Sequence, residues 1–420
     1  MYEVVIQHCI SLQSNPVSMK KRFEVLDVLR GVAVSMVVLF HMSAFSDTPL
    51  INNYLVGNSD LFIDFFFVIS GFIISHNYRH ISSLEKLQQF LKRRWLRMYP
   101  LHLILLLVFG IIVTATHLYW GYVPIKGMNN ANNTWISFIS SLLLLKSVKF
   151  PGVNGESWNT SSWIVSAVMI SYIFFGGLML VLHEVRKSQY KKHFAASIVV
   201  LAIAILTLVK GNGMLNYSYD FGYLRGLAGF FTGVLCHLTF KSMQKRLNAM
   251  PARFFTIAEI GSLLSIAIFI YEGAFFKQVG SVYLVLFYLA ILVFAYENGA
   301  VSALLRQSGI LKRIGQYAYS IYMTHTLLLS LFSFLFIDLL HLSPSDYTWL
   351  FAFNLLLIYE VSKWTYKHIE MRFAYKEKNI APIQTVPKKV AYVKGMPTAH
   401  KFEQTALFDK QQLNDKTRDA

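Results

Sequence analysis

Two basic residues, Arg30 and His41, interrupt the apolar run "LDVLRGVAVSMVVLFHMSAF" near the start of the chain. Ionisable side chains are costly in hydrocarbon, so inside a membrane span they typically mark a functional site. Their spacing places both on nearly the same helical face, about 16 Å apart along the axis. A histidine, whose ordinary pKa of about 6.5 is close to working pH, is suited to accept a proton from a hydroxyl. The alternatives are that Arg30 extends to the membrane surface and that His41 makes a packing hydrogen bond.

A carboxylate, Asp64, lies in the next apolar run, "DLFIDFFFVISGFIIS" at 60–75. If successive spans run in opposite directions, Asp64 and His41 lie at similar depths in the membrane. A carboxylate beside an imidazole fixes its tautomer and stabilises the imidazolium that forms on protonation. Alternatively, Asp64 marks the membrane interface. In the same run the small pair Ser70-Gly71 predicts a place where another backbone or a slender ligand passes close by.

Arginines follow that run in "FLKRRWLRMYP", at Arg93, Arg94 and Arg97. The guanidinium is a planar fork of donors that suits a polyphosphate ligand. A basic loop required by membrane topology, or binding of anionic lipid headgroups, would explain the run equally well. Taken together with the histidine and the carboxylate, these residues predict transfer of an activated group from a phosphate-rich donor to an alcohol.

The elements that must position these residues are membrane helices. The 420-residue chain is 55% hydrophobic and 15% charged, which is too apolar for an ordinary soluble protein. Windows of about 20 apolar residues, enough to cross a bilayer, predict an all-α polytopic membrane protein with about ten spans. These spans are 25–45, 60–77, 98–119, 162–182, 194–209, 222–240, 254–273, 279–297, 317–340 and 347–366. The apolar piece at 134–145 is too short to cross and is predicted to be interfacial or re-entrant.

The formal charge of +17 does not indicate a nucleic-acid partner, because the basic residues fall in alternate loops. This positive-inside bias predicts that both chain ends lie in the cytoplasm. On that topology the outer loops hold Lys126, Lys146, Lys149, Lys210 and Lys277. Residues 1–22 are expected to form a cytoplasmic leader, with Met19 as an alternative true start. Residues 374–420 are expected to form a flexible basic tail, too short and polar to build a further soluble domain.

Four runs resemble the acyltransferase 3 family in order and spacing, over residues 23–373: Arg30-Gly31 to His41, "FFFVISGFII" at 65–74, "RRWLRMYP" at 93–100 and "GQYAYSIYMTHTLLL" at 315–329. The resemblance implies a stand-alone integral membrane acyltransferase without a fused soluble hydrolase-like domain. Such a protein moves an acyl group, commonly acetyl, from cytoplasmic acyl-CoA to a hydroxyl of a cell-envelope carbohydrate or lipid-linked glycan. It implies acyl-CoA as the donor substrate, no bound cofactor and no metal. Together with the apolar composition it suggests a bacterial inner membrane, and it leaves the oligomeric state open.

The resemblance also implies roles for individual residues. His41 matches the catalytic histidine, and Asp64 is its expected partner. The expected donor-binding arginines are Arg30, Arg93 and Arg97. Two further family positions, with acceptor-side or supporting roles, are matched by Arg225 in "RGLAGFFTG" and His325 in "YMTH".

Two departures from the family pattern bear on function. Val168 in "SSWIVSAVMISY" stands where the family often has a glutamate, and Met371 in "IEMRF" stands where proline is common, although Glu370 is kept. The first departure leaves open a divergent acceptor, replacement by another acid such as Glu156, or an inactive member. Two other readings also stay open: a different acyl group such as succinyl, and a transporter, against which the chain shows no inverted repeat.

Overall fold

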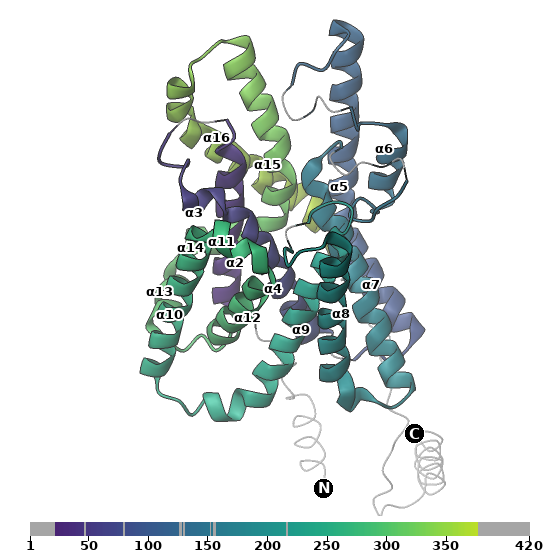
Figure 1. Ribbon diagram of the computed structural model, residues 1–420, viewed down its shortest axis with the longest axis vertical. Helices are drawn as coiled ribbons and strands as arrows, with labels where there is room; N and C mark the ends of the chain where they lie inside the picture. Colours follow the sequence, from purple (N-terminus) through teal and green to yellow (C-terminus); the bar gives the residue numbers. More distant parts are fainter. Residues whose placement is uncertain are drawn as a thin grey trace, which may run out of the picture. The chain divides into compact units, whose positions relative to one another are not determined.

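The computed structural model describes residues 22–45, 48–78, 80–125, 128, 131–151, 153, 157–215 and 217–376. Within these ranges the regular secondary structure is helical and contains no strand (Figure 1). The protein is therefore an all-α polytopic membrane protein, which confirms the fold class predicted from composition. The predicted leader up to residue 21, the tail from residue 377 and Glu156 lie outside the described residues.

Each predicted span coincides with a helix. These helices are α2 (Glu24–Met42), α4 (Phe62–Asn77), α5 (Leu84–Trp120), α7 (Trp163–Glu184), α8 (Lys191–Lys210), α9 (Gly222–Leu247), α10 (Ala252–Tyr271), α12 (Ser281–Phe294), α15 (Ala318–Ser333) and α16 (Pro344–Thr365). Shorter helices connect them: α3 (Tyr54–Gly57), α6 (Trp135–Leu142), α11 (Gly273–Phe276), α13 (Ala300–Gln307), α14 (Gly309–Gln316) and α17 (Met371–Lys376). Single turns of 3₁₀- or π-helix complete the described chain at η1 (Ser59–Leu61), η2 (Thr160–Ser162), η3 (Ser188–Tyr190), η4 (Lys277–Val279), η5 (Phe334–Leu339) and η6 (Tyr366–Glu370).

Among the described residues, seven helices are long and apolar enough to cross a membrane. An eighth span results if Gly273–Val279 and Ser281–Phe294, bent by 100° at their junction, are taken as one. The spans predicted in α9 and α16 do not meet the same criterion of length and apolarity. The number of crossings and the cytoplasmic location of both ends therefore stay predictions.

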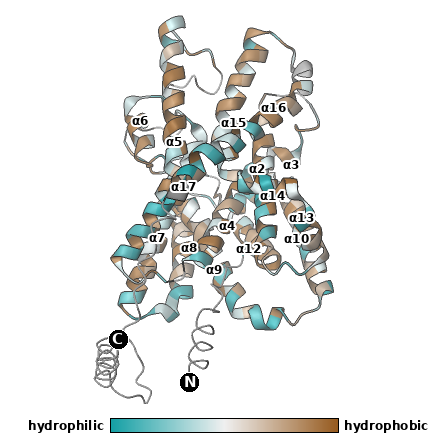
Figure 2. Ribbon diagram, turned by 180° about the vertical axis from the view of Figure 1, so that it is seen from behind, coloured by the Kyte–Doolittle hydropathy of each residue, from teal (hydrophilic) through white to brown (hydrophobic). Residues whose placement is uncertain are grey.

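The long helices divide into an outer and a central group. In α8 and in α10, 17% of the apolar window is buried inside the protein. The buried share is 67% for the span through α4 and 61% for the spans through α7 and α15. Apolar residues predominate along the helices, and hydrophilic ones gather at the connections at the lower end (Figure 2). Hydrocarbon must cover the outer helices, so the central helices are the ones that can hold a polar site.

Glycines bring α4 and α9 into backbone contact. A Cβ added at Gly71 of α4 would lie 1.8 Å from the carbonyl oxygen of Phe230, and one added at Gly233 of α9 would lie 1.8 Å from that of Val68. Small residues at such positions let two membrane helices approach closely. The close approach of another backbone, predicted from Ser70-Gly71, is thereby confirmed.

A second glycine contact seats the start of α2 against α14. A Cβ on Gly31 would lie 2.5 Å from the carbonyl oxygen of Leu311, and one on Gly315 would lie 1.7 Å from that of Asp27. Arg30 is therefore held beside the short helix that precedes α15. The pairing of arginine with glycine at 30–31 has a packing reason, because no larger residue fits at position 31.

The arginine run does not form a loop but belongs to one 37-residue helix, α5. The side chain of Ser83 accepts a hydrogen bond from the backbone N–H of Lys86 at the start of this helix, and Gly121 ends it at a φ of 74°. At about 1.5 Å per residue the helix is about 55 Å long, well beyond a hydrocarbon thickness of about 30 Å. The arginines lie part-way along this rod and can face the centre of the bundle.

The short apolar piece at 134–145 forms α6. A capping box at Thr134 and Ser137 starts the helix, which has eight residues. This length is too short to cross a bilayer, as predicted. Its location at the membrane interface stays a prediction.

Candidate active site

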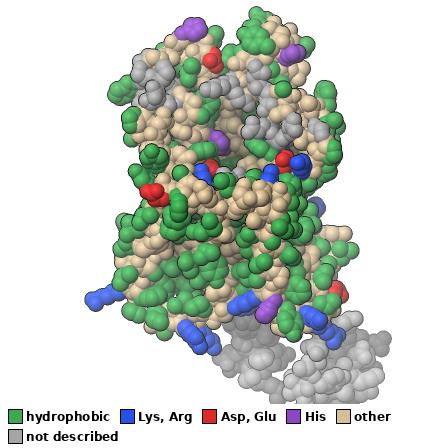
Figure 3. Space-filling view, in the orientation of Figure 1, with side chains coloured by type: hydrophobic (Ala, Val, Ile, Leu, Met, Phe, Trp, Pro, Cys, Tyr) green, Lys and Arg blue, Asp and Glu red, His purple; other side chains and the backbone are tan. Residues whose placement is uncertain are grey.

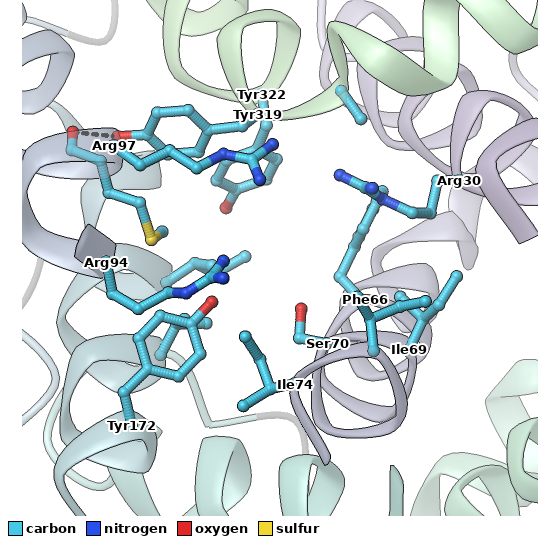
Figure 4. A pocket seen from close by; sticks show the side chains of 15 residues that line it. Arg30, Phe66, Ile69, Ser70, Ile74, Arg94, Arg97, Tyr172, Tyr319 and Tyr322 are labelled. Atoms are coloured by element: carbon cyan, nitrogen blue, oxygen red, sulfur yellow. Dashed lines mark hydrogen bonds between the residues drawn. The ribbon is translucent and has the colours of Figure 1, made fainter. Parts of the chain in front are cut away.

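Three arginines converge on one cavity of about 130 Å³ among α2, α4, α5, α7 and α15 (Figure 4). Arg30 enters from α2, and Arg94 and Arg97 approach from α5 on the opposite side. The remaining wall is largely apolar and aromatic, with Tyr172 from α7 and Tyr322 from α15. We call this space the arginine cavity.

Each guanidinium is oriented by a partner but keeps donors for a ligand. Arg30 Nη1 lies 3.4 Å from an oxygen of Asp27, and Arg97 Nε donates to Glu370 at 3.1 Å. Arg94 Nη2 donates to the hydroxyl of Tyr78 at 2.9 Å, while Arg94 Nε is buried without a hydrogen-bond partner among the described residues. This nitrogen is a donor that can bond to an acceptor on a ligand. The cavity is therefore suited to an anion with several oxygens.

Arg93, the donor-binding residue expected beside Arg97, is exposed and does not line the arginine cavity; Arg94 takes that place. Burial raises the pKa of the Tyr78 hydroxyl, but the charges of Arg94 and Arg93 outweigh it and lower the pKa below 10. The sequence alone did not distinguish the two neighbours, because the choice depends on which face of α5 turns inward.

Glu370 supplies a carboxylate partner for Arg97, which lines the arginine cavity. Its side chain is fully buried, binds Arg97 with one oxygen and accepts a hydrogen bond from Ser320 Oγ at 3.0 Å with the other. Val168, at the position of the expected family glutamate, lines the same cavity and is 5% exposed. The sequence singled out Glu370 as a kept family residue but gave no sign of this contact, which joins residues 273 positions apart.

His41 faces a second histidine. The ring centroids of His41 and His325 lie 4.9 Å apart, and Phe40 packs on the other side at 5.1 Å. His325 Nδ1 lies 2.7 Å from the carbonyl oxygen of Tyr322. A carbonyl oxygen accepts, so Nδ1 carries the proton and Nε2 keeps its lone pair. His325 Nε2 is buried without a hydrogen-bond partner among the described residues, so it is available to accept a hydrogen bond.

The structure pairs Asp64 with Arg225 and not with His41. Arg225 Nε and Nη2 donate to the two carboxylate oxygens at 2.7 and 2.9 Å, and both side chains are buried. The close approach of α4 and α9 brings these residues together, and a buried guanidinium requires a carboxylate partner. Arg225 also lies over the ring of Trp163 at 5.6 Å. The expected contact between Asp64 and His41 is thus replaced by an ion pair, while the role of Asp64 in catalysis stays a prediction.

Hydrogen bonds hold the residues before η2 against Lys146 and α15. Lys146 Nζ donates to the carbonyl oxygens of Ser157 and, at 2.6 Å, Asn159. Asn159 Nδ2 in turn donates to the carbonyl oxygen of Met323 at 3.3 Å, two residues before His325. Burial lowers the pKa of Lys146 to about 7. The sequence analysis placed Lys146 among the outer-loop lysines and gave no sign of these hydrogen bonds.

The two groups of residues are linked through Tyr322. This side chain lines the arginine cavity, and its ring centroid lies 5.4 Å from that of His325. Arg30 and His41 also share α2. The arginine cavity and the histidine pair therefore share Tyr322 and α2. In the part of the chain that the structure describes, no group of three His, Cys, Asp or Glu side chains is placed to hold a metal ion.

Comparison with known proteins bears on the family of the chain. A family model described as an acyltransferase domain matches residues 23–362. "Protein 2 in picA locus" of Rhizobium radiobacter is 34% identical over 93 residues, which make up 20% of this chain and 43% of that relative. The matched region thus spans less than half of the relative's length. No solved structure matches.

Proposed function

The chain belongs to the acyltransferase 3 family and is a membrane acyltransferase; we propose that it transfers an acetyl group from acetyl-CoA to a hydroxyl of a cell-envelope or lipid-linked saccharide. The observation that carries this proposal is the arginine cavity, which shares α2 and Tyr322 with the histidine pair. We place the diphosphate of the donor at Arg30, Arg94 and Arg97. The pantetheine arm then follows α2 for about 16 Å to His41.

The reaction is proposed to take place at His41 and His325. His41 takes the proton from the acceptor hydroxyl, and the oxygen forms a bond with the thioester carbonyl carbon. The carbon–sulfur bond breaks, and the leaving thiolate takes the proton from His41, so the products are an ester and free coenzyme A. His325, with its lone pair on Nε2, holds the neighbouring ring and stabilises the proton while it is on His41.

The test also covers two alternatives that the sequence left open, a succinyl donor and a transporter. A succinyl donor would use the same arginine cavity, because the acyl group lies at the other end of the molecule. A transporter would need no thioester chemistry at His41. Donor turnover therefore separates these alternatives without knowledge of the acceptor's structure.

The test is release of free thiol by the purified protein in nanodiscs, with acetyl-CoA or succinyl-CoA as donor and an envelope extract as acceptor. His41→Gln should lower kcat by about 10²- to 10⁴-fold. The matched control is His117→Gln, which changes an exposed histidine at the end of α5 and should leave kcat unchanged. Equal thiol release by wild type and His41→Gln, or none by wild type, would refute the proposal.

The arginines give a second comparison within one helix. Arg94→Gln removes a guanidinium that lines the cavity, whereas Arg93→Gln removes an exposed one. The KM for acetyl-CoA should rise by about tenfold or more for Arg94→Gln, since hydrogen bonds to charged groups contribute about 1.5–3 kcal/mol. A smaller effect of Arg94→Gln than of Arg93→Gln would contradict the placement of the donor.

A further inference from the structure

A second cavity, of about 280 Å³, lies at the end of the bundle that holds the α7–α8 connection. Its wall combines the ends of α4 and α7, the turn η3, the start of α8 and a face of α9. None of its described lining residues is acidic. Three lysines and two histidines line it: Lys191, Lys192, Lys241, His80 and His237. We call this space the lysine cavity.

The lysine cavity concentrates positive charge. Lys191 of α8 and Lys241 of α9 lie close enough for their charges to repel each other. Lys192 is held by a hydrogen bond of 3.2 Å from its Nζ to Ser242 Oγ. The long helix α8 also begins here, and its positive dipole end adds to the field. Basic side chains gather at this lower end of the molecule in Figure 3. An anionic ligand would relieve the repulsion between the lysines.

The lysine cavity adjoins the arginine cavity. Ile74 lines the arginine cavity and its neighbour Ser75 lines the lysine cavity. Arg94, in the arginine cavity, donates a hydrogen bond to Tyr78, which lines the lysine cavity. Along α7 the wall passes from Tyr172 to Met179, about 10 Å further along the axis. The two anion sites are therefore neighbours on the same helices.

The remaining wall of the lysine cavity is apolar. Phe175 and Met179 from α7 face it, together with Val234 and Leu238 from α9. A flat heteroaromatic base fits against such a wall while phosphates lie at the lysines. This mixture of apolar wall and clustered cations is typical of a pocket for a nucleotide.

Coenzyme A carries a diphosphate and, on its ribose, a separate phosphate ester, so a protein that binds the whole donor needs two anion sites. Resting on the function proposed above, we infer that the lysine cavity binds the adenosine 3′-phosphate end of the acyl-CoA donor, while the arginine cavity next to it binds the diphosphate. The donor then lies along α4 and α7 and enters the bundle from the end where α8 begins. Its ribose phosphate is the group that Lys191 and Lys241 recognise.

The test compares donors with and without the ribose phosphate. For the wild type, the KM for acetyl-dephospho-CoA should exceed that for acetyl-CoA by about tenfold or more. In the Lys191→Gln/Lys241→Gln variant this difference should disappear, because the KM for acetyl-CoA rises towards that for acetyl-dephospho-CoA. Lys245→Gln is the matched control, because Lys245 is exposed on α9 one turn beyond Lys241 and does not line the cavity. It should keep the wild-type preference.

A binding measurement keeps this inference separate from the proposed function. Adenosine 3′,5′-bisphosphate should bind to the purified wild-type protein in phosphatidylcholine nanodiscs and bind about tenfold more weakly to the double variant, whether or not thiol is released. Wild-type turnover without any preference for the ribose phosphate would overturn the inference and leave the proposed function standing. Failure of the bisphosphate to bind, with lysine-dependent binding of phosphatidylglycerol in its place, would assign the cavity to a lipid headgroup and overturn it as well.

Discussion

Replacing Asp64 by asparagine separates two accounts of this carboxylate. In the structure it forms a bidentate ion pair with Arg225 at 2.7 and 2.9 Å, with side-chain exposures of 3% and 2%. Removal of one partner from a buried pair costs about 3–5 kcal/mol, because the other charge stays buried without compensation. Asp64→Asn should therefore lower the free energy of unfolding by about that amount. Arg225→Gln should lower it similarly.

The double variant distinguishes the pair from two independent losses. Asp64→Asn/Arg225→Gln leaves two neutral amides that can bond to each other, so its destabilisation should be smaller than the sum of the single effects. A coupling free energy of about 1–3 kcal/mol is expected for residues in direct contact. If Asp64 instead orients His41, Asp64→Asn should lower kcat with little change in stability, and the second substitution should restore nothing.

Equilibrium unfolding in mixed dodecylmaltoside and SDS micelles, followed by tryptophan fluorescence, measures these changes. Trp163 lies 5.6 Å from the Arg225 guanidinium and reports on the pair directly. Asp60→Asn is the control, because the pair of Asp60 with Lys277 has side-chain exposures of 20% and 19%, and loss of a pair that water reaches should cost less than loss of the buried pair. Asp64→Asn and Asp60→Asn variants of equal stability would refute the reasoning about the buried pair.

Three further changes test other parts of the structure. Val168→Glu places a carboxylate among the cavity guanidiniums and should raise the KM for acetyl-CoA by about tenfold, measured by thiol release, whereas an unchanged KM would contradict the cavity assignment. Gly233→Ala puts a Cβ 1.8 Å from a backbone oxygen and should destabilise by at least about 1–3 kcal/mol in the micelle assay, while Gly177→Ala, in open space on α7, should not. Lys146 has a folded-state pKa of about 7, lowered by burial from 10.5, so the unfolded chain binds more protons between these values. Stability should therefore rise with pH above about 7, and Lys146→Met should remove that slope while Lys149→Met, at an exposed lysine, should keep it.

The helices could be predicted from the sequence because each rests on a local signal. Windows of apolar residues located every long helix, and the small pair at Ser70-Gly71 located the contact between α4 and α9. Within α5, however, apolarity gave the span at 98–119 and not the helix from Leu84 to Trp120. The continuation is polar, and its helical state depends on capping and on packing against the rest of the bundle.

The partners of the polar side chains could not be predicted, because depth in the membrane does not fix direction around a helix axis. Asp64 and His41 were placed at similar depths on neighbouring helices, yet the facing residue on α9 is Arg225. His325 was singled out, but its closeness to His41 depends on α15 packing against α2 from the far end of the chain. Such contacts are set by tertiary packing and leave no periodic trace in the sequence.

Val168 and Glu370 bear on whether this protein has lost a catalytic carboxylate. A glutamate at 168 would face three guanidiniums in the arginine cavity, where it would compete with the phosphates of a donor. Glu370 already binds Arg97 from outside that space and is itself held by Ser320, so it orients a guanidinium without occupying the ligand's place. Valine at 168 therefore makes the cavity more positive and leaves its arginines oriented. On the function proposed above, valine at 168 therefore favours binding of the anionic donor, and thiol release by the wild type is the measurement that decides between this account and an inactive member.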